Sequence, residues 1–431
     1  MRLKPAPYVA VGVWVLLVDV GVWLGEALYE RGHSIVLHAP PILAEPTPIP
    51  GLNLALPIVA ALGLIAVLPS LVERVRWTVM IAVVGLASAV WTVALAMAEG
   101  RGGLTRGITD RTDYLVDLPA VRADASGFLR GFTRHIGRFE IQTRGHPPGM
   151  LLILDLLDRV GLRGPGWAAT LIIGVAATAP IAVLLTVREV AGERAARRCA
   201  PWLALTPAAI WIATSADALY MGVGAWAIAL VVLASGRHGY RSAALAVGGG
   251  LLGGLALMGS YGIILLATIP AAVLVSRRAD QRNVIRIVGA SIAGVTAILA
   301  VFAVLGFWWI DGLRATIHQY AILDLDRPYA GFLVINVAAW ALALGPATFV
   351  GLALLHDRRV WTIVGASLAA VALAELSGLS AGEVERIWLP FTLWVLPAAA
   401  AINTTRLRTR VGLALQAASA MWLISTVTTQ W

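Results

Sequence analysis

The sequence predicts an all-α fold, a polytopic bundle of transmembrane helices. Hydrophobic residues make up 59% of the 431 positions, charged residues only 13%, and the mean hydropathy is +0.82. These values lie far outside the range of soluble domains. Apolar runs follow one another along the whole chain, with short polar connectors between them. Because one crossing takes about 20 apolar residues, the chain has room for roughly a dozen spans and for no large soluble domain.

About thirteen apolar runs are expected to form spanning helices. The first run is expected to stay as an uncleaved span, because no small-residue cleavage site follows a short hydrophobic region. The runs lie near residues 8–28, 51–71, 77–97, 166–187, 200–214, 217–235, 242–258, 261–275, 287–306, 331–354, 360–376, 386–402 and 411–428.

Basic residues, nearly all of them arginine, concentrate in the connectors and set the expected orientation. The positive-inside rule places these connectors in the cytoplasm, so the net charge of +9 indicates topology and not nucleic-acid binding. The arginine-rich composition is compatible with an actinobacterial source. The basic connectors are residues 73–76, 188–198, 237–241, 277–286, 357–359 and 406–410.

The long polar segments then fall on the outer side: residues 29–50, 98–146, 307–330 and 377–385. The apolar stretch 147–160 starts outside and must not complete a crossing, so it is expected to be a short or re-entrant helix.

The outer segment 98–146 contains an amphipathic stretch with apolar residues three and four apart. This spacing predicts a juxtamembrane helix on the outer membrane surface, with a solvated loop that packs on the protein as the alternative. The stripe consists of Phe128, Leu129, Phe132, Ile136 and Phe139.

Two pairs of motifs carry the candidate chemistry. The first pair consists of the carboxylates in 110–114 and the segment His146-Pro147-Pro148, which leads into an apolar run. A rigid helix start at the two prolines would hold an acid or base just above the membrane. The alternative is an ordinary helix start, because proline is well tolerated in a first helical turn. Asp217 lies between apolar runs, where an ionised carboxylate should be either paired or functional. Arg386 begins a late apolar run and could bind a phosphate bidentately, or snorkel as an ordinary helix-end arginine.

Aromatic and polar residues alternate in 307–330. Trp308 and Trp309 suit either sugar binding or the interfacial aromatic belt, and the belt is favoured. The charged run 324–329 is expected to cap the site or to contact a donor phosphate.

The order of these motifs resembles the GT-C superfamily of glycosyltransferases, particularly protein O-mannosyltransferases and lipid A aminoarabinose transferases. Residues 110–114 resemble the family's Asp-Glu-x-x-Tyr motif, and 146–148 its His/Lys-Pro-Pro motif. Residues 214–219 resemble Thr-Asp-Ala/Pro-Leu, and 385–390 resemble Arg-Tyr-x-x-Pro. Arg111 replaces the family's glutamate, which leaves open whether Asp110 or Asp113 is the functional acid.

The resemblance covers roughly residues 77–402 and implies a division of the chain. Residues 1–76 would be additional N-terminal helices, 77–402 the GT-C-like core with its external loop 98–146, and 403–431 a C-terminal helix.

The resemblance also implies an activity at the outer face of the plasma membrane. A sugar would pass, with inversion, from a polyprenyl-phosphate-linked donor to a hydroxyl of a cell-envelope glycan, lipid or protein, with Asp110 or Asp113 as general base. The expected donor and phosphate ligands are Arg386, Arg327, His146, Arg144 and Glu385. The expected cavity residues are Tyr114, Asp217, His318 and Tyr329.

No cofactor and no metal site are expected, although a carboxylate-bound divalent cation at the donor phosphate stays open. The single cysteine, Cys199, excludes intrachain disulfides and cysteine-rich metal sites. His135 and His146, eleven residues apart, do not form a credible metal pair. A transporter or flippase of a lipid-linked or small polar substrate is the main alternative, and a noncatalytic scaffold the second. The concentration of acidic residues in outer loops favours an enzyme, because transporters place charges near mid-span.

Overall fold

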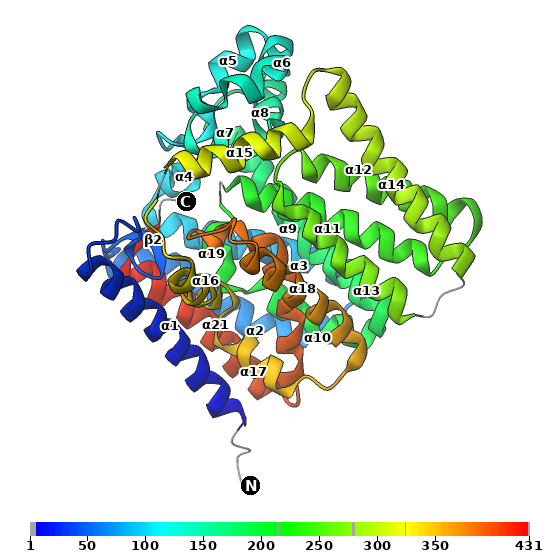
Figure 1. Ribbon diagram of the computed structural model, residues 1–431. Helices are drawn as coiled ribbons and strands as arrows, with labels where there is room; N and C mark the ends of the chain where they lie inside the picture. Colours follow the sequence, from blue (N-terminus) through cyan, green and yellow to red (C-terminus); the bar gives the residue numbers. More distant parts are fainter. Residues whose placement is uncertain (1–5, 214, 278–280, 324, 430–431) are drawn as a thin grey trace.

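The computed structural model describes residues 6–213, 215–277, 281–323 and 325–429, and these are almost entirely helical. Eight helices of the described part are long and apolar enough to cross a membrane. This confirms the predicted all-α, polytopic fold. The eight are α1 (Ala6–Glu30), α2 (Ala55–Arg74), α3 (Trp77–Ala96), α9 (Pro165–Ala191), α11 (Ala216–Ser235), α12 (Gly239–Leu257), α14 (Gln281–Val304) and α18 (Arg358–Leu376) (Figure 1).

The other five predicted spans are broken, short or arginine-containing. Prolines and glycines interrupt four of them, because proline lacks the backbone donor and clashes with the preceding turn. Counting the pair bent by 93° as one span raises the total in the described residues to nine, fewer than the roughly thirteen predicted. The five comprise α10 (Glu193–Ala204) with the 3-10 turn Pro207–Trp211, the 3-10 turn Gly262–Ala267 with α13 (Thr268–Ser276), the bent pair α16 (Tyr329–Leu344) and α17 (Pro346–Leu354), α20 (Leu389–Val395) with the 3-10 turn Leu396–Ile402, and α21 (Arg406–Thr426).

Short helices gather at one end of the bundle, at the top of Figure 1. The helix α8 spans only eleven residues, which agrees with the short form expected for 147–160. The group comprises α4 (Arg106–Thr109), α5 (Leu118–Ala123), α6 (Ala125–His135), α7 (Ile141–Gly145), α8 (Gly149–Arg159) and α15 (Trp309–Leu323).

The apolar stripe that begins in α6 packs against protein. Phe128, Phe132 and Ile136 are all buried. The ring of Phe132 packs edge-on against Phe307, with centroids 5.5 Å apart, and stacks on Phe139. Because protein covers the apolar surface of this stripe, the stripe holds α6 against the connection between α14 and α15.

A small antiparallel sheet joins the segment between α1 and α2 to the residues that follow α21. Strand β1 (His38–Ala39) pairs with β2 (Ile42–Glu45), which pairs with β3 (Thr428–Thr429). The helix α1 packs against α16 and α17, and α2 packs against α3 and α21. The first two helices are therefore packed directly on the rest of the bundle.

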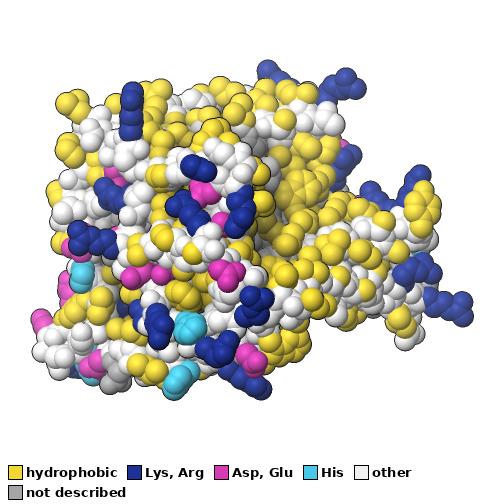
Figure 2. All heavy atoms as spheres, turned by 90° about the horizontal axis from the view of Figure 1, so that it is seen from above, with side chains coloured by type: hydrophobic (Ala, Val, Ile, Leu, Met, Phe, Trp, Pro, Cys, Tyr) yellow, Lys and Arg dark blue, Asp and Glu magenta, His cyan; other side chains and the backbone are white. Residues whose placement is uncertain are grey.

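The basic connectors contact one another on a single face of the molecule. The guanidinium of Arg197 donates to the carbonyl of Val72 at 2.6 Å. Glu189 pairs with Arg237 at 2.9 Å and with Arg277 at 3.2 Å. The connectors that the sequence analysis grouped by their positive charge therefore also lie together in space. Figure 2 shows another aspect: charged and histidine side chains are intermixed on one part of the surface, beside a hollow with apolar walls.

Helices α12 and α14 approach closely through glycine, and this contact gives a stability prediction. A Cβ added at Gly250 would overlap the carbonyl oxygen of Ser291, whereas one at Gly253 would make ordinary contacts with Val295 at 3.6 Å and Ala227 at 4.0 Å. We expect Gly250→Ala to destabilise the protein by about 1–3 kcal/mol and to lower its melting temperature in detergent. Gly253→Ala on the same helix is the control and should be neutral or stabilising, since alanine is the better helix former. Equal effects of the two substitutions would contradict close backbone packing here.

Candidate active site

Four segments that are far apart in the sequence bring buried polar side chains together. Asp113 comes from the external loop, His146 precedes α8, Asp217 lies in the first turn of α11, and Arg386 lies in the short helix α19 (Val384–Ile387). All four residues are at most 9% exposed. We call these four residues the polar cluster.

Asp217 and Arg386 form the central ion pair of the polar cluster. A guanidinium nitrogen of Arg386 donates to one oxygen of Asp217, and both side chains are almost fully buried. The hydroxyl of Ser215 caps α11 by accepting from the Asp217 amide at 3.2 Å. An acidic residue in a first helical turn also interacts favourably with the helix dipole. The sequence-based expectation that Asp217 is either paired or functional is therefore met by a pairing.

Arg386 also contacts a second carboxylate. Its Nη2 donates to Glu383 at 2.6 Å. Glu383 adopts a left-handed backbone conformation with φ 60°, which turns the chain into α19. With two carboxylates beside it, the charge of Arg386 is already compensated. To bind a donor phosphate, Arg386 would have to exchange one carboxylate for that phosphate.

Hydrogen bonds from Asn336 of α16 hold the loop that carries Glu383. Its amide nitrogen donates to Glu375 at 3.1 Å and to the carbonyl of Ser380 at 2.8 Å, and its oxygen accepts from Gly382 at 2.9 Å. This buried network satisfies polar groups of both elements and holds α19 in place.

The two candidate bases have different surroundings. One carboxylate oxygen of Asp110 accepts from both the amide and the hydroxyl of Thr112, at 2.9 and 2.7 Å, which makes an Asx turn. Asp113 accepts from the amide of Tyr114 at 2.7 Å and is only 6% exposed. Burial raises the pKa of Asp113 to about 7, against the opposing effect of the Tyr114 amide and of Arg386. Asp110 is thus engaged in local structure, whereas Asp113 has a pKa suited to proton transfer near neutrality.

His146 connects the external loop to Asp217. Its Nδ1 lies 2.8 Å from the carbonyl of Gln142, which can only accept, so Nδ1 carries a proton. Its Nε2 lies 3.9 Å from Asp217. Burial lowers the pKa of His146, although the charge of Asp217 opposes this. The neutral ring therefore presents an acceptor nitrogen toward the polar cluster.

The remaining predicted donor ligands occupy different surroundings. Arg327 donates to the carbonyls of Ile35, at 2.9 Å, and Ala381, and so clamps the first external loop to the loop before α19. Glu385 is fully buried next to Arg386. Arg144 makes no side-chain hydrogen bond or ion pair within the described part of the chain, and its Nε is buried without a partner. Among the predicted phosphate ligands, Arg144 is therefore the arginine whose positive charge the described residues leave without a hydrogen-bond or ion-pair partner.

Two predicted cavity residues are not brought to the polar cluster. His318 is exposed on α15, and the hydroxyl of Tyr329 donates to the carbonyl of Leu376 at 3.2 Å. Tyr114, in contrast, packs beside His146 with ring centroids 6.1 Å apart. Trp309 is buried and donates to the carbonyl of Leu257 at 2.9 Å, so it anchors α15 and offers no exposed face to a sugar. Thr214 and Asp324, which belong to two of the motifs, lie outside the described residues.

Glu383 and Tyr220 are not among the predicted site residues, although Glu383 lies only three residues before Arg386 in the sequence. Tyr220 lies one turn after Asp217 on α11, and its hydroxyl lies beside that of Tyr114. The spacing of three residues from Asp217 was the available signal, because such residues share a helix face. Within the described residues, no group of three or more histidine, cysteine, aspartate or glutamate side chains could hold a metal ion.

Glu385 gives a prediction about stability and pH. Burial raises its pKa from 4.5 to about 8. Between these values the folded protein keeps a proton that the unfolded chain releases, so stability is lost as the pH rises through this window. We expect Glu385→Gln to leave the melting temperature unchanged near pH 4.5 and to stabilise the protein by roughly 2–4 kcal/mol at pH 8. The control is Glu30→Gln at an exposed position, which should have no effect at either pH. A stabilisation by Glu385→Gln that is independent of pH would contradict a buried, protonated carboxyl group.

Comparisons with known proteins gave only structural similarities. No family model matches the sequence, and no curated protein matches it. The apo crystal structure of the Archaeoglobus fulgidus oligosaccharyltransferase aligns with a TM-score of 0.49 and 14% identity, over 83% of this chain and 57% of the archaeal chain. The archaeal oligosaccharyltransferase AglB from the same organism, in complex with an inhibitory peptide and a dolichol-phosphate, aligns with a TM-score of 0.42 and 14% identity, over 79% and 55% of the two chains. At this level the similarities carry no argument about the activity of the present chain.

Proposed function

We propose that this chain is a GT-C-type glycosyltransferase that transfers a sugar from a polyprenyl-phosphate-linked donor to a hydroxyl of a cell-envelope glycan or lipid. The observation that supports this proposal most is the polar cluster itself. Asp113, His146, Asp217 and Arg386 belong to the four motifs that resemble the superfamily, and they converge in one buried place at the end of the bundle.

The proposed reaction needs a base for the acceptor. The acceptor oxygen attacks the anomeric carbon while Asp113 takes its proton, and the bond between that carbon and the phosphate oxygen breaks. Polyprenyl phosphate leaves, and the configuration at the anomeric carbon is inverted. A pKa of about 7 lets Asp113 take the proton during the step and return it to solvent near neutral pH.

The leaving phosphate needs positive charge. Arg144 lies two residues before His146 and supplies an uncompensated guanidinium. Arg386 adds a second one when the phosphate displaces Glu383 or Asp217. Positive groups fixed in a water-poor site stabilise a developing phosphate charge more strongly than they would in water.

The proposed orientation places the polar cluster on the outer face of the plasma membrane. The basic connectors of 73–76, 188–198 and 277–286 belong to the opposite ends of helices α2, α9 and α14 from the polar outer segments. With those connectors in the cytoplasm, a sugar presented on a membrane-embedded lipid can reach Asp113 from outside.

The test is to incubate the purified full-length protein with a panel of polyprenyl-phospho-sugars and a cell-envelope extract. Mass spectrometry would follow both released polyprenyl phosphate and the glycosylated acceptor. Release accompanied by a new glycosylated product supports the proposal. Absence of release from every donor, together with uptake of a lipid-linked sugar into protein-containing vesicles, would instead support a transporter or flippase.

A further inference from the structure

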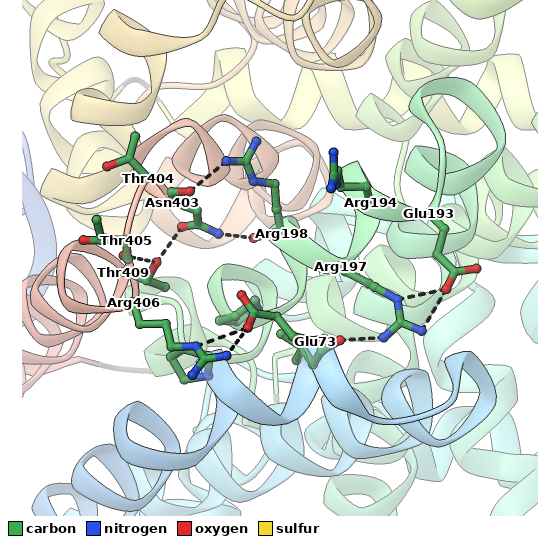
Figure 3. A pocket seen from close by; sticks show the side chains of 13 residues that line it. Glu73, Glu193, Arg194, Arg197, Arg198, Asn403, Thr404, Thr405, Arg406 and Thr409 are labelled. Carbon is green, nitrogen blue, oxygen red and sulfur yellow. Dashed lines mark hydrogen bonds and ion pairs between the residues drawn. The ribbon is translucent and has the colours of Figure 1, made fainter.

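A cavity of about 660 Å³ lies among the basic connectors and is lined by other residues than those of the polar cluster. Figure 3 shows side chains of α10 facing those of residues 403–409 and of the end of α2. Such a volume is typical of sites for small organic ligands and is much larger than one water molecule needs. The charged side chains around it are Glu73, Glu193, Arg194, Arg197, Arg198 and Arg406.

The four arginines exceed the two glutamates, so the cavity has a formal charge of +2. Glu193 pairs with Arg197 at 2.8 Å, and Glu73 pairs with Arg406 at 2.7 Å. These pairs compensate two of the arginines. The excess charge therefore resides on Arg194 and Arg198.

Arg194 and Arg198 are close enough along α10 to bind the same anion. They lie four residues apart on α10, so their side chains share one face of the helix. Arg198 donates through one nitrogen to the carbonyl of Asn403 at 2.7 Å, and this contact leaves its other donors for a ligand. Arg194 makes no hydrogen bond or ion pair with the residues that the structure describes, and Figure 3 draws it without a partner. Two guanidinium groups of this kind bind phosphate oxygens in a fixed geometry.

Other walls of the cavity suit the rest of a phosphate-bearing molecule. The hydroxyl of Thr404 accepts a bond from Arg408 at 2.9 Å, and its own proton can point to a ligand. Pro69, Val72 and Pro201 supply an apolar side. The ligand chemistry is thus a phosphate ester with a less polar group attached.

We infer that this basic cavity, defined by Arg194 and Arg198, is a binding site for a phosphate ester on the face opposite to the proposed active site. The phosphate belongs either to the headgroup of an anionic membrane lipid or to a soluble phosphoester. The inference does not rest on the proposed function, since no residue of the polar cluster lines this cavity.

The test measures binding to the purified full-length protein by native mass spectrometry. The probes are phosphatidylglycerol, phosphatidylcholine and inorganic pyrophosphate. The variant Arg194→Glu/Arg198→Glu should weaken phosphatidylglycerol or pyrophosphate binding by roughly tenfold or more. The matched control is Arg241→Glu, an exposed arginine on the same face that does not line the cavity. All three side chains are exposed, and the double variant loses only the hydrogen bond of Arg198 to Asn403, so the variants should unfold within a few degrees of the wild type.

The outcomes separate the two sources of phosphate. Binding of phosphatidylglycerol that pyrophosphate does not displace supports a lipid headgroup, whereas displacement or direct pyrophosphate binding supports a soluble phosphoester. No binding of either probe would overturn the inference. An equal loss of binding in Arg241→Glu would also overturn it, because the attraction would then be a property of the whole basic face.

Discussion

Replacing Asp113 with asparagine is expected to lower the rate of sugar transfer by about 10²–10⁴-fold, the usual contribution of a general base. Asparagine keeps the shape of the side chain and can still accept from the amide of Tyr114, so the protein should stay folded. The measurement is the rate of polyprenyl phosphate release at saturating donor, with the melting temperature as a check on folding.

The control is Asp110→Asn. Asp110 holds Thr112 in an Asx turn and is only partly buried, so its loss should cost about 1 kcal/mol of local stability and change the rate much less. A larger loss of rate in Asp110→Asn than in Asp113→Asn would assign the base to the other carboxylate. The pH profile gives a second check: the wild-type rate should fall below about pH 7, because protonated Asp113 cannot accept a proton.

Arg386→Gln is expected to destabilise the protein by roughly 3–5 kcal/mol, since it leaves the buried charge of Asp217 without its partner. The measurement is the melting temperature or the resistance to denaturant in detergent. The double variant Asp217→Asn/Arg386→Gln removes both charges and should recover a large part of the loss.

The control for this effect is Arg314→Gln, which breaks the exposed pair between Arg314 and Asp311 at 3.7 Å. An exposed pair contributes at most about 1 kcal/mol, so little change is expected. If the double variant were as unstable as the sum of its two single variants, the central role of the Asp217–Arg386 pair would be contradicted.

The sequence was sufficient to predict the fold class and to single out the residues of the polar cluster. Long apolar runs determine membrane helices almost by themselves, because a bilayer leaves backbone polar groups no other solution. Asp217 stood out because a carboxylate between apolar runs needs compensation, and Arg386 supplies it. The motifs around Asp113 and His146 indicated the outer loop, and the structure places both beside that pair. Their catalytic roles stay predictions.

Other features depend on tertiary contacts that no local pattern carries. Arg327 was expected to bind a phosphate, yet it contacts the carbonyls of Ile35 and Ala381 across about 290 and 54 residues of sequence. The stripe of α6 has the spacing of a membrane-surface helix, and only the position of Phe307 shows that protein covers it. The bend of 93° in the predicted span 331–354 is a different case, because Gly345 and Pro346 were a local signal for it in the sequence.

The central claim is that a lipid-linked sugar reacts at the polar cluster. The most direct measurement is a cryo-EM structure of the full-length protein in lipid nanodiscs with a non-hydrolysable polyprenyl-phosphonate sugar. We expect the anomeric carbon to lie beside Asp113 and the phosphonate beside Arg144, with Arg386 released from one of its carboxylates. A phosphonate bound elsewhere, with Asp217 and Glu383 still paired to Arg386, would contradict the claim.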